Sequence, residues 1–279
     1  MAGGTRRNAI SYDDERLILA IAAVSGIIAA FAPAEPTGQG AIDALLLMAF
    51  AVFTTWAGAS APWWALATGA GLVTASAVKG PVVVTLAGLA ALGASVWIGD
   101  RRANQPVIRA AIAAVVVQVA VRLEWNPVFL WSAVIAATAT GLIIVTGILR
   151  RRRYVRRRVY LGGAILAGLA VLATAGLALA ASGTRSSATA GYTGILDGLD
   201  YVQQGKTTEA AEALRDAATN LEEASSSFAG ILSQPARLVP GVAQNRTAAA
   251  EVLDRAAESA ASAALTLDVV VLDQLTVQD

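Results

Sequence analysis

The feature that most constrains this chain is a series of seven apolar runs in its first two thirds. The runs cover residues 17–31, 41–59, 62–78, 82–99, 107–121, 128–149 and 159–181. A helix needs roughly 20 mainly apolar residues to cross the hydrocarbon core of a bilayer, with some tolerance for shorter runs. The pattern predicts seven transmembrane helices. Runs 17–31, 62–78 and 107–121 are short, which leaves open whether each crosses completely.

The gaps between the runs contain residues that end helices. They hold Pro33 and Pro36, then Pro62, then Gly80 and Pro81, then Asp100 to Arg102 with Pro106, and finally Asn126 and Pro127. Proline is well tolerated at the first position of a helix, so these prolines fit helix starts. Only 15% of the residues are charged, against about 25% in a soluble domain. The sequence therefore predicts an all-α fold containing a polytopic helical membrane bundle.

A dense arginine segment separates the sixth run from the seventh. Its seven arginines are Arg150, Arg151, Arg152, Arg153, Arg156, Arg157 and Arg158. Positive residues concentrate in short cytoplasmic loops. A cytoplasmic N-terminus puts this segment inside with Arg6, Arg7, Arg16, Arg101, Arg102 and Arg109, and leaves Lys79 and Arg122 outside. We therefore expect a multi-pass plasma-membrane protein with a cytoplasmic N-terminus and an extracytoplasmic C-terminal region.

The same segment has two further interpretations. Juxtamembrane arginines attract anionic lipid headgroups by about 1 kcal/mol per charge, so the cytoplasmic leaflet is an expected partner. A nucleic-acid site usually interleaves aromatic side chains with the positive charge, and only Tyr154 and Tyr160 lie nearby. We expect no nucleic-acid partner.

The composition changes after Ser182. From Arg185 onward the chain has six basic and thirteen acidic residues, an excess of seven negative charges. The sequence thus predicts three parts: a cytoplasmic segment 1–16, a transmembrane domain 17–183 and an acidic extracytoplasmic region 184–279. The apolar run 269–272 close to the end suggests that the natural chain continues beyond Asp279.

Helical patterns fill the acidic region. The first covers 192–204 and ends at Gly205, a residue typical of helix C-termini. The second covers 208–232, and two sets of apolar residues recur in it every seven positions. The third covers 243–275 and is rich in alanine. Heptad spacing predicts an antiparallel helical hairpin or short coiled coil. The heptad residues of the second pattern are Leu214, Ala217, Leu221, Ala224, Phe228 and Ile231. The apolar residues of the third pattern are Val252, Leu253, Ala256, Ala260 and Leu267.

The connection between the two long patterns is "LSQPARLVPGVAQNRTAA". Pro235 is expected to end one helix, and Pro240 with Gly241 to turn the chain before Asn245 enters the next. Together with "GKTTEAAEAL" at 205–214, the run "PARLVPGVAQNR" at 235–246 resembles the actinobacterial domain-of-unknown-function 4012 family of envelope membrane proteins. The resemblance covers about the last eighty residues and implies an envelope location. That family has no established activity, so it supplies no catalytic residues.

The residue types limit the chemistry of the chain. It has no cysteine and no histidine, which removes thiol nucleophiles, imidazole bases and the commonest zinc ligands. We expect no metal and no cofactor. Four polar residues inside the runs, Gln118, Thr54, Thr55 and Thr74, are expected to form hydrogen bonds between helices.

Four charged residues share the predicted outer surface and are weak candidates for an outward site. They are Glu35, Asp43, Arg122 and Glu124. Exposed charges at the membrane interface explain them equally well. Catalytic residues, and whether the chain is an enzyme at all, stay open.

These observations favour an envelope membrane protein whose acidic helices form an outward stalk or interaction module for another envelope protein or a second copy. The alternative is a membrane enzyme or carrier for lipid-linked envelope polysaccharide precursors. A third hypothesis, a sensor signalling through the seventh helix, lacks a cytoplasmic output domain in this sequence.

Overall fold

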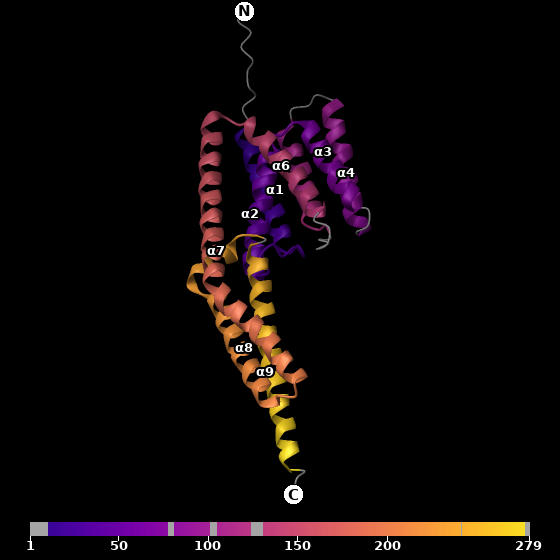
Figure 1. Ribbon diagram of the computed structural model, residues 1–279. Helices are drawn as coiled ribbons and strands as arrows, with labels where there is room; N and C mark the ends of the chain where they lie inside the picture. The colour runs from indigo at the N-terminus through magenta and orange to yellow at the C-terminus, as the bar shows by residue number, and fades with distance from the viewer. Residues whose placement is uncertain (1–10, 78–80, 101–104, 124–130, 241, 277–279) are drawn as a thin grey trace, which may run out of the picture. The chain divides into compact units, whose positions relative to one another are not determined.

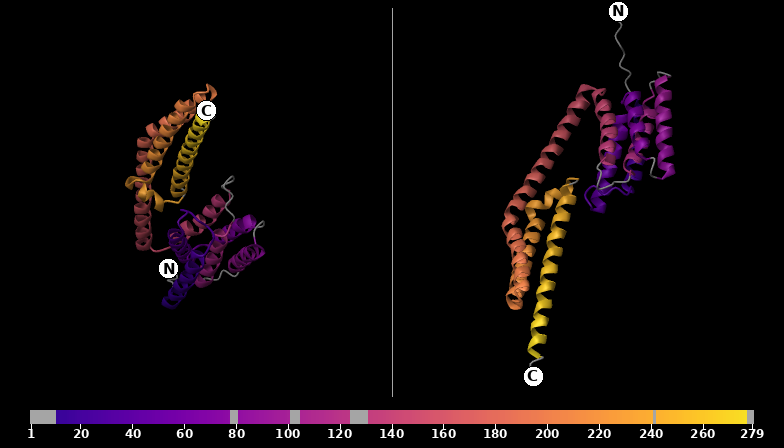
Figure 2. Two further views of the ribbon diagram at one scale, coloured as in Figure 1. Left: turned by 90° about the horizontal axis from the view of Figure 1, so that it is seen from below. Right: turned by 45° about the vertical axis from the view of Figure 1, so that its right-hand side comes forward.

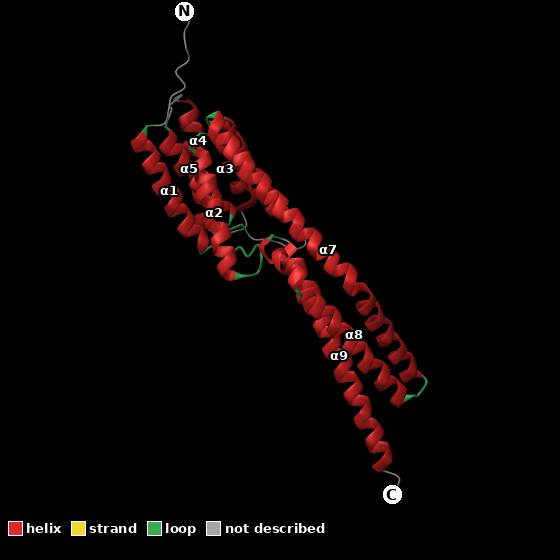
Figure 3. Ribbon diagram, turned by 90° about the vertical axis from the view of Figure 1, so that its left-hand side faces the viewer, coloured by secondary structure: helices red, strands yellow, loops and turns green. Residues whose placement is uncertain are grey.

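The structure is a computed structural model that describes residues 11–77, 81–100, 105–123, 131–240 and 242–276 of the chain (Figure 1). Within these ranges all regular secondary structure is helical, as the colouring in Figure 3 shows. The prediction of an all-α chain is confirmed.

The chain forms two compact units. The first comprises Met1–Glu35 with Gln39–Ala164, and the second comprises Pro36–Gly38 with Ile165–Asp279. Helix α7 (Arg153–Gln203) is unbroken over 51 residues and contributes to both units. The expected boundary after residue 183 marks a change of composition within this helix, whereas the units divide between residues 164 and 165.

In the described part of the first unit, six helices precede α7. They are α1 (Tyr12–Ala30), α2 (Gly40–Gly58), α3 (Trp63–Ala77), α4 (Val82–Asp100), α5 (Pro106–Ala120) and α6 (Trp131–Leu149). Helix α1 begins before the predicted run because the hydroxyl oxygen of Ser11 accepts the backbone N–H of Asp14 at 3.1 Å. Such a cap satisfies an amide that has no partner within the helix.

Several of these helices suit a bilayer. Among the described residues, four are long and apolar enough to cross a membrane: α2, α4, the Ser132–Leu149 part of α6, and α7. Helix α5 is apolar but shorter, α3 has 15 residues, and α1 carries three acids in its first turn. The count of seven spans stays a prediction.

The core of the first unit lies between α3, α5 and α6. Leu66, Val73, Val116 and Ile143 are completely buried in it. Gly147 lies so close to α2 that a Cβ there would overlap the carbonyl oxygen of Ala57. Small residues at such crossings allow helices to pack closely where the surroundings are apolar.

The outer surface of this unit is rich in large apolar side chains. On α4, for example, Val83, Leu86 and Leu89 are exposed. Extended apolar surface of this kind is rare on soluble monomers and is typical of a surface that contacts lipid or protein.

Three helices complete the second unit beside α7. They are α8 (Thr207–Ala229), the 3₁₀ helix η1 (Ile231–Leu238) and α9 (Val242–Thr276). Helices α8 and α9 pack along each other and lie side by side in both views of Figure 2. Leu214, Ala217, Leu221 and Ala224 are buried, as the heptad pattern on α8 predicts.

Helix α7 packs on α8 through three glycines. A Cβ on Gly191 would lie 2.6 Å from Cγ of Leu221, and one on Gly198 would lie 2.8 Å from Cγ of Leu214. Gly194 faces Ala217 in the same row. Glycine at every third or fourth position thus leaves room for the leucines of α8.

The turn after α7 is formed as expected. Gly205 has φ = 73°, a conformation that suits glycine. Its N–H donates to the carbonyl oxygen of Val202 at 3.0 Å, and the N–H of Lys206 donates to that of Tyr201 at 2.9 Å. This pair of bonds is the Schellman motif, which satisfies the last carbonyls of a helix.

Two details of the second unit differ from the expectation. Helix α8 ends at Ala229 and not at residue 232, because Gly230 leaves the helical conformation (φ −60°, ψ 167°). Pro235 therefore lies inside η1 and does not end α8. Val252, expected in the apolar stripe of α9, is exposed, since the buried face of that helix runs through Ala257, Ala260 and Ala264.

Candidate functional site

One arginine of the 150–158 segment has a defined structural role. Arg151 Nη2 donates to the carbonyl oxygen of Trp56 at 2.7 Å, and its guanidinium carbon lies 4.1 Å from the centroid of the Trp56 ring. Trp56 is in the last turn of α2, where four carbonyls have no partner within the helix. The other three accept backbone N–H groups of Ala59, Ser60 and Ala61. Arg151 therefore completes the C-terminal cap of α2.

Electrostatics also favour this position for a cation. The C-terminus of a helix carries partial negative charge. Burial lowers the pKa of Arg151, and the carboxylate of Glu15 opposes that shift. Arginine starts from so high a pKa that it stays protonated in proteins. Arg151 thus acts as a permanent cation between the end of α2 and the start of α1.

The other six arginines of the segment remain at or near the surface. Arg150, Arg152, Arg153, Arg157 and Arg158 are exposed, and Arg156 is half-buried. Arg158 lies over the ring of Tyr154 at 4.1 Å, and Arg156 Nη1 donates to the carbonyl oxygen of Leu149 at 3.5 Å. These side chains can reach anionic groups in solution or in a headgroup layer.

The predicted outward candidates have separate environments. Asp43 is buried in the first turn of α2, where its Oδ2 accepts the backbone N–H of Gln39 at 2.9 Å, so this carboxylate caps the start of that helix. Glu35 is exposed. Glu124 lies outside the described residues. Arg122 belongs to a network between α1 and α5.

Gln118 is the centre of that network. Its Nε2 donates to the carbonyl oxygen of Ser25 at 2.7 Å and to Ser25 Oγ at 3.1 Å. Arg122 Nη1 donates to the Gln118 carbonyl oxygen at 3.1 Å and to its Oε1, and Nη2 donates to the Ile28 carbonyl oxygen at 3.2 Å. The network joins the C-terminal half of α1 to the C-terminal end of α5, although the two helices are far apart in the sequence.

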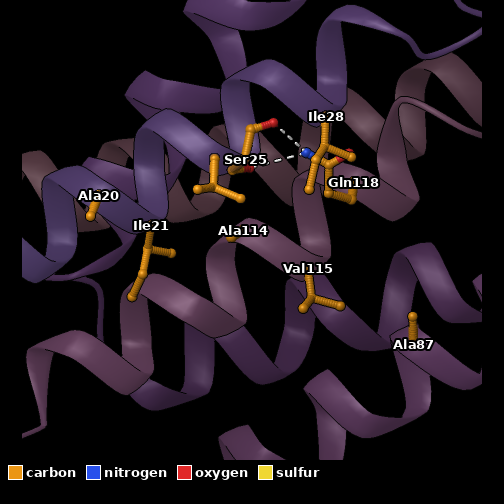
Figure 4. A pocket seen from close by; sticks show the side chains of 9 residues that line it. Ala20, Ile21, Ser25, Ile28, Ala87, Ala114, Val115 and Gln118 are labelled. Carbon is orange, nitrogen blue, oxygen red and sulfur yellow. Dashed lines mark hydrogen bonds between the residues drawn. The ribbon is translucent and has the colours of Figure 1, made fainter.

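An apolar groove begins beside these polar groups. It has a volume of about 460 Å³ and lies between α1, α4 and α5 (Figure 4). The polar groups in its lining are the side chains of Ser25 and Gln118, and the remaining lining is aliphatic. The lining residues are Ala20, Ile21, Val24, Ser25, Ile28, Ala87, Ala114, Val115 and Gln118.

The other polar residues of the helices behave differently from Gln118. Gln118 forms the expected bonds between helices. Thr54 and Thr74 instead donate to the carbonyl oxygens of Phe50 and Ala70 in their own helices, at 2.8 and 2.6 Å. The hydroxyl of Thr55 is buried without a hydrogen-bond partner among the described residues. The expectation of bonds between helices is wrong for the threonines, because a hydroxyl near its own helix can bond the carbonyl four residues earlier.

The connection between α8 and α9 contains a buried contact that the sequence analysis did not predict. Arg246, 6% exposed, donates from Nε to Ser233 Oγ at 3.1 Å. Ser233 Oγ in turn donates to backbone carbonyls at the end of α8. Burial lowers the pKa of Arg246, and repulsion from Arg237 adds to this. The only feature of the sequence that pointed to this contact was an arginine at the start of an alanine-rich helix.

The predicted turn residues near this connection have simpler positions. Pro235 is exposed within η1, Pro240 is exposed after it, and Asn245 is exposed in the first turn of α9. Gly241 lies outside the described residues. The fixed point of the connection is therefore the Arg246–Ser233 contact.

No group of three acidic, histidine or cysteine side chains suited to a metal ion occurs within the described ranges. The scan against protein-family models gave no match, and neither did the comparisons with curated proteins and with solved structures.

Proposed function

We propose that the chain is a multi-pass envelope membrane protein whose acidic helices, on the outer side, bind another envelope protein or a second copy. The observation that carries this proposal is an exposed apolar stripe on α7 within the acidic unit. The stripe consists of Tyr192, Leu196, Leu199 and Val202, and these side chains are 41–62% exposed.

The stripe has the spacing of a helix-packing surface. Its members recur every third or fourth position, so they share one face of α7. A neighbouring face, with Gly191, Gly194 and Gly198, already packs on α8. The stripe is therefore an additional apolar face on a helix that already packs on α8, and such a face is typical of a protein contact site. This surface belongs to the interaction module that we propose, together with the α8–α9 hairpin.

Contacts in the first unit support seven alternating spans. With a cytoplasmic N-terminus, the start of α1, the end of α2 and the arginine segment all belong to the inner side. Arg151 contacts Trp56 and lies within electrostatic range of Glu15. The end of α1 and the end of α5 belong to the outer side, and Arg122 bonds to the Ile28 carbonyl there. Each contact joins segments that the proposed topology puts on the same side.

The charge distribution supports the same orientation. Positive charge concentrates in the segments assigned to the cytoplasm. Six arginines of the 150–158 segment do not take part in the cap that Arg151 forms on α2. Anionic headgroups of the inner leaflet are their proposed partners. The excess of seven negative charges from Arg185 onward lies on the proposed outer side. This placement is compatible with the positive-inside rule, which depends on lysine and arginine and little on acidic residues.

The stripe can be tested by photo-crosslinking in intact cells. In the cysteine-free chain, a Leu199→Cys variant is labelled with a maleimide-linked benzophenone and irradiated. We expect one discrete product of higher mass, which mass spectrometry identifies as a complex with one envelope protein or with a second copy. Adding Leu196→Glu to this variant removes the product, because a charge in the stripe is costly to bury.

The matched control is Thr193→Cys, an exposed position on the polar face of the same helix. We expect little or no discrete product from this site. Equal products from both sites, or none from Leu199→Cys, would contradict the proposed module.

A further inference from the structure

We infer that the groove between α1, α4 and α5 binds one acyl chain of an anionic phospholipid, whose phosphate is recognised by Arg122. This site lies in the first unit and is independent of the stripe on α7. It requires only that α1, α4 and α5 are embedded in a bilayer.

The shape and lining of the groove suit a hydrocarbon chain. Its volume of about 460 Å³ falls within the roughly 300–1,000 Å³ of small-molecule sites. The accessible lining of the groove is apolar, because the polar groups of Ser25 and Gln118 bond to each other beside it (Figure 4). An apolar groove that lies beside a polar network fits the hydrocarbon part of an amphiphile better than it fits a polar solute.

Arg122 places a positive charge beside the groove, next to the Ser25–Gln118 network. It lies one helical turn beyond Gln118 and bonds to two residues that line the groove, Gln118 and Ile28. The guanidinium is therefore fixed at the mouth of the groove from both the α1 and the α5 sides. It comes directly after α5, the depth at which lipid headgroups begin.

Within the described ranges, the hydrogen-bond partners of this guanidinium are neutral groups. It donates to the backbone oxygens of Gln118 and Ile28 and to the amide oxygen of Gln118. No carboxylate among the described residues forms an ion pair with it. A guanidinium has five N–H donors, so donors remain for an additional acceptor. The charge of the site is complementary to a phosphate, which arginine recognises through charge-assisted hydrogen bonds.

The Gln118 amide fixes this arrangement. Its Nε2 donates to Ser25 on α1, so its Oε1 must face Arg122. One residue therefore orients the cation and also lines the groove. A bilayer phospholipid, with its chain and phosphate joined by a short linker, is the occupant that meets both requirements at once.

The test measures lipid retention by the purified full-length chain in native mass spectrometry. The probes are phosphatidylglycerol and phosphatidylcholine with identical acyl chains. We expect the wild-type chain to retain one phosphatidylglycerol about tenfold more strongly than phosphatidylcholine, the preference that one charge-assisted contact provides. Arg122→Gln is expected to bind both lipids equally, and Arg122→Lys to keep part of the preference.

Two further variants separate the parts of the site. Arg16→Gln removes an exposed arginine elsewhere on α1 and is expected to leave the preference unchanged. Ala114→Leu adds volume inside the groove and is expected to weaken retention of both lipids.

Three results would overturn the inference. One is an unchanged preference in Arg122→Gln that is folded by circular dichroism. Another is wild-type retention by Ala114→Leu. The third is competition by glycerol phosphate as strong as that by phosphatidylglycerol, which would assign the site to a soluble anion and make the groove irrelevant.

Discussion

Arg151 differs from its six neighbours in the arginine segment although the sequence gives them the same residue type. Among the described residues of the segment, Arg151 combines a hydrogen bond to the end of α2 with stacking on the ring of the same residue, Trp56, whereas Arg156 and Arg158 each form one weaker or more local contact of these kinds. The remaining members serve as surface charge. A run of identical residues thus combines a structural cap with a surface suited to headgroups.

This difference leads to a prediction for Arg151→Ala. The change leaves the Trp56 carbonyl without its donor and removes the stacking contact, at a cost of roughly 1.5–3 kcal/mol for a hydrogen bond to a charged group. We expect a lower thermal unfolding midpoint for the protein in detergent, measured by far-ultraviolet circular dichroism.

Arg152→Ala is the matched control, since Arg152 is exposed in the same connection. Its midpoint should stay close to that of the wild type. Equal loss of stability in both variants would show that the segment contributes through its total charge and not through the cap on α2.

Residue types predicted some of these contacts and missed others. The hydrogen bond of Gln118 between helices was predictable, because a buried amide in an apolar run needs partners. Its actual partner Ser25 was not, since 93 positions separate the two residues. The roles of Arg151 and Arg246 depend on which helix end lies beside each side chain, and only the packed structure contains that information.

Helix α7 shows how one element combines several surfaces. Beyond its apolar part it has a glycine face toward α8, the stripe that contains Leu199, and a polar face that contains Thr193. The three faces follow from helical periodicity alone. The glycine face packs on α8 because the heptad leucines of α8 occupy the space that the glycines leave.

The glycine face can be tested by two alanine substitutions with opposite expected signs. At Gly191 the new Cβ overlaps Leu221, and overpacking of this kind typically costs about 1–3 kcal/mol. At Gly183 nothing lies within 4 Å of the new Cβ, and replacing glycine by alanine within a helix stabilises it by roughly 0.8–1 kcal/mol. Thermal unfolding should show Gly191→Ala below the wild type and Gly183→Ala at or above it. The packing of α7 on α8 is contradicted if both variants shift in the same direction.

Element positions were largely predictable, and element ends were less so. The apolar runs located α1 to α6, and Gly205 located the end of α7. Both signals depend on the residue types within a short stretch of sequence and not on distant packing. The end of α8 at Ala229 was missed, since Gly230 competes with Pro235 as a terminator and the sequence does not rank them. The exposure of Val252 was missed because alanine gives a weak periodic signal, so the buried face of α9 could not be located.

At the scale of the whole molecule, two independent features are consistent with the topology that we propose. The positive-inside rule uses only the position of charged residues. The contacts of Arg151 with the end of α2 and of Arg122 with the end of α1 use only the packing of helices. The rule assigns the arginine segment to the cytoplasmic side, and the contacts join segments that the proposed seven-span topology puts on the same side. Together they are the basis of our proposal that the acidic helices lie outside.

The most direct test of this account uses the absence of cysteine in the chain. Single cysteines are introduced as Ser226→Cys on α8 and Arg152→Cys in the arginine segment, both at exposed positions. Intact cells are then treated with a membrane-impermeant maleimide. We predict labelling at position 226 in intact cells and at position 152 only after the membrane is permeabilised. Labelling of intact cells at position 152 but not at 226 would invert the orientation and contradict the proposed outward module.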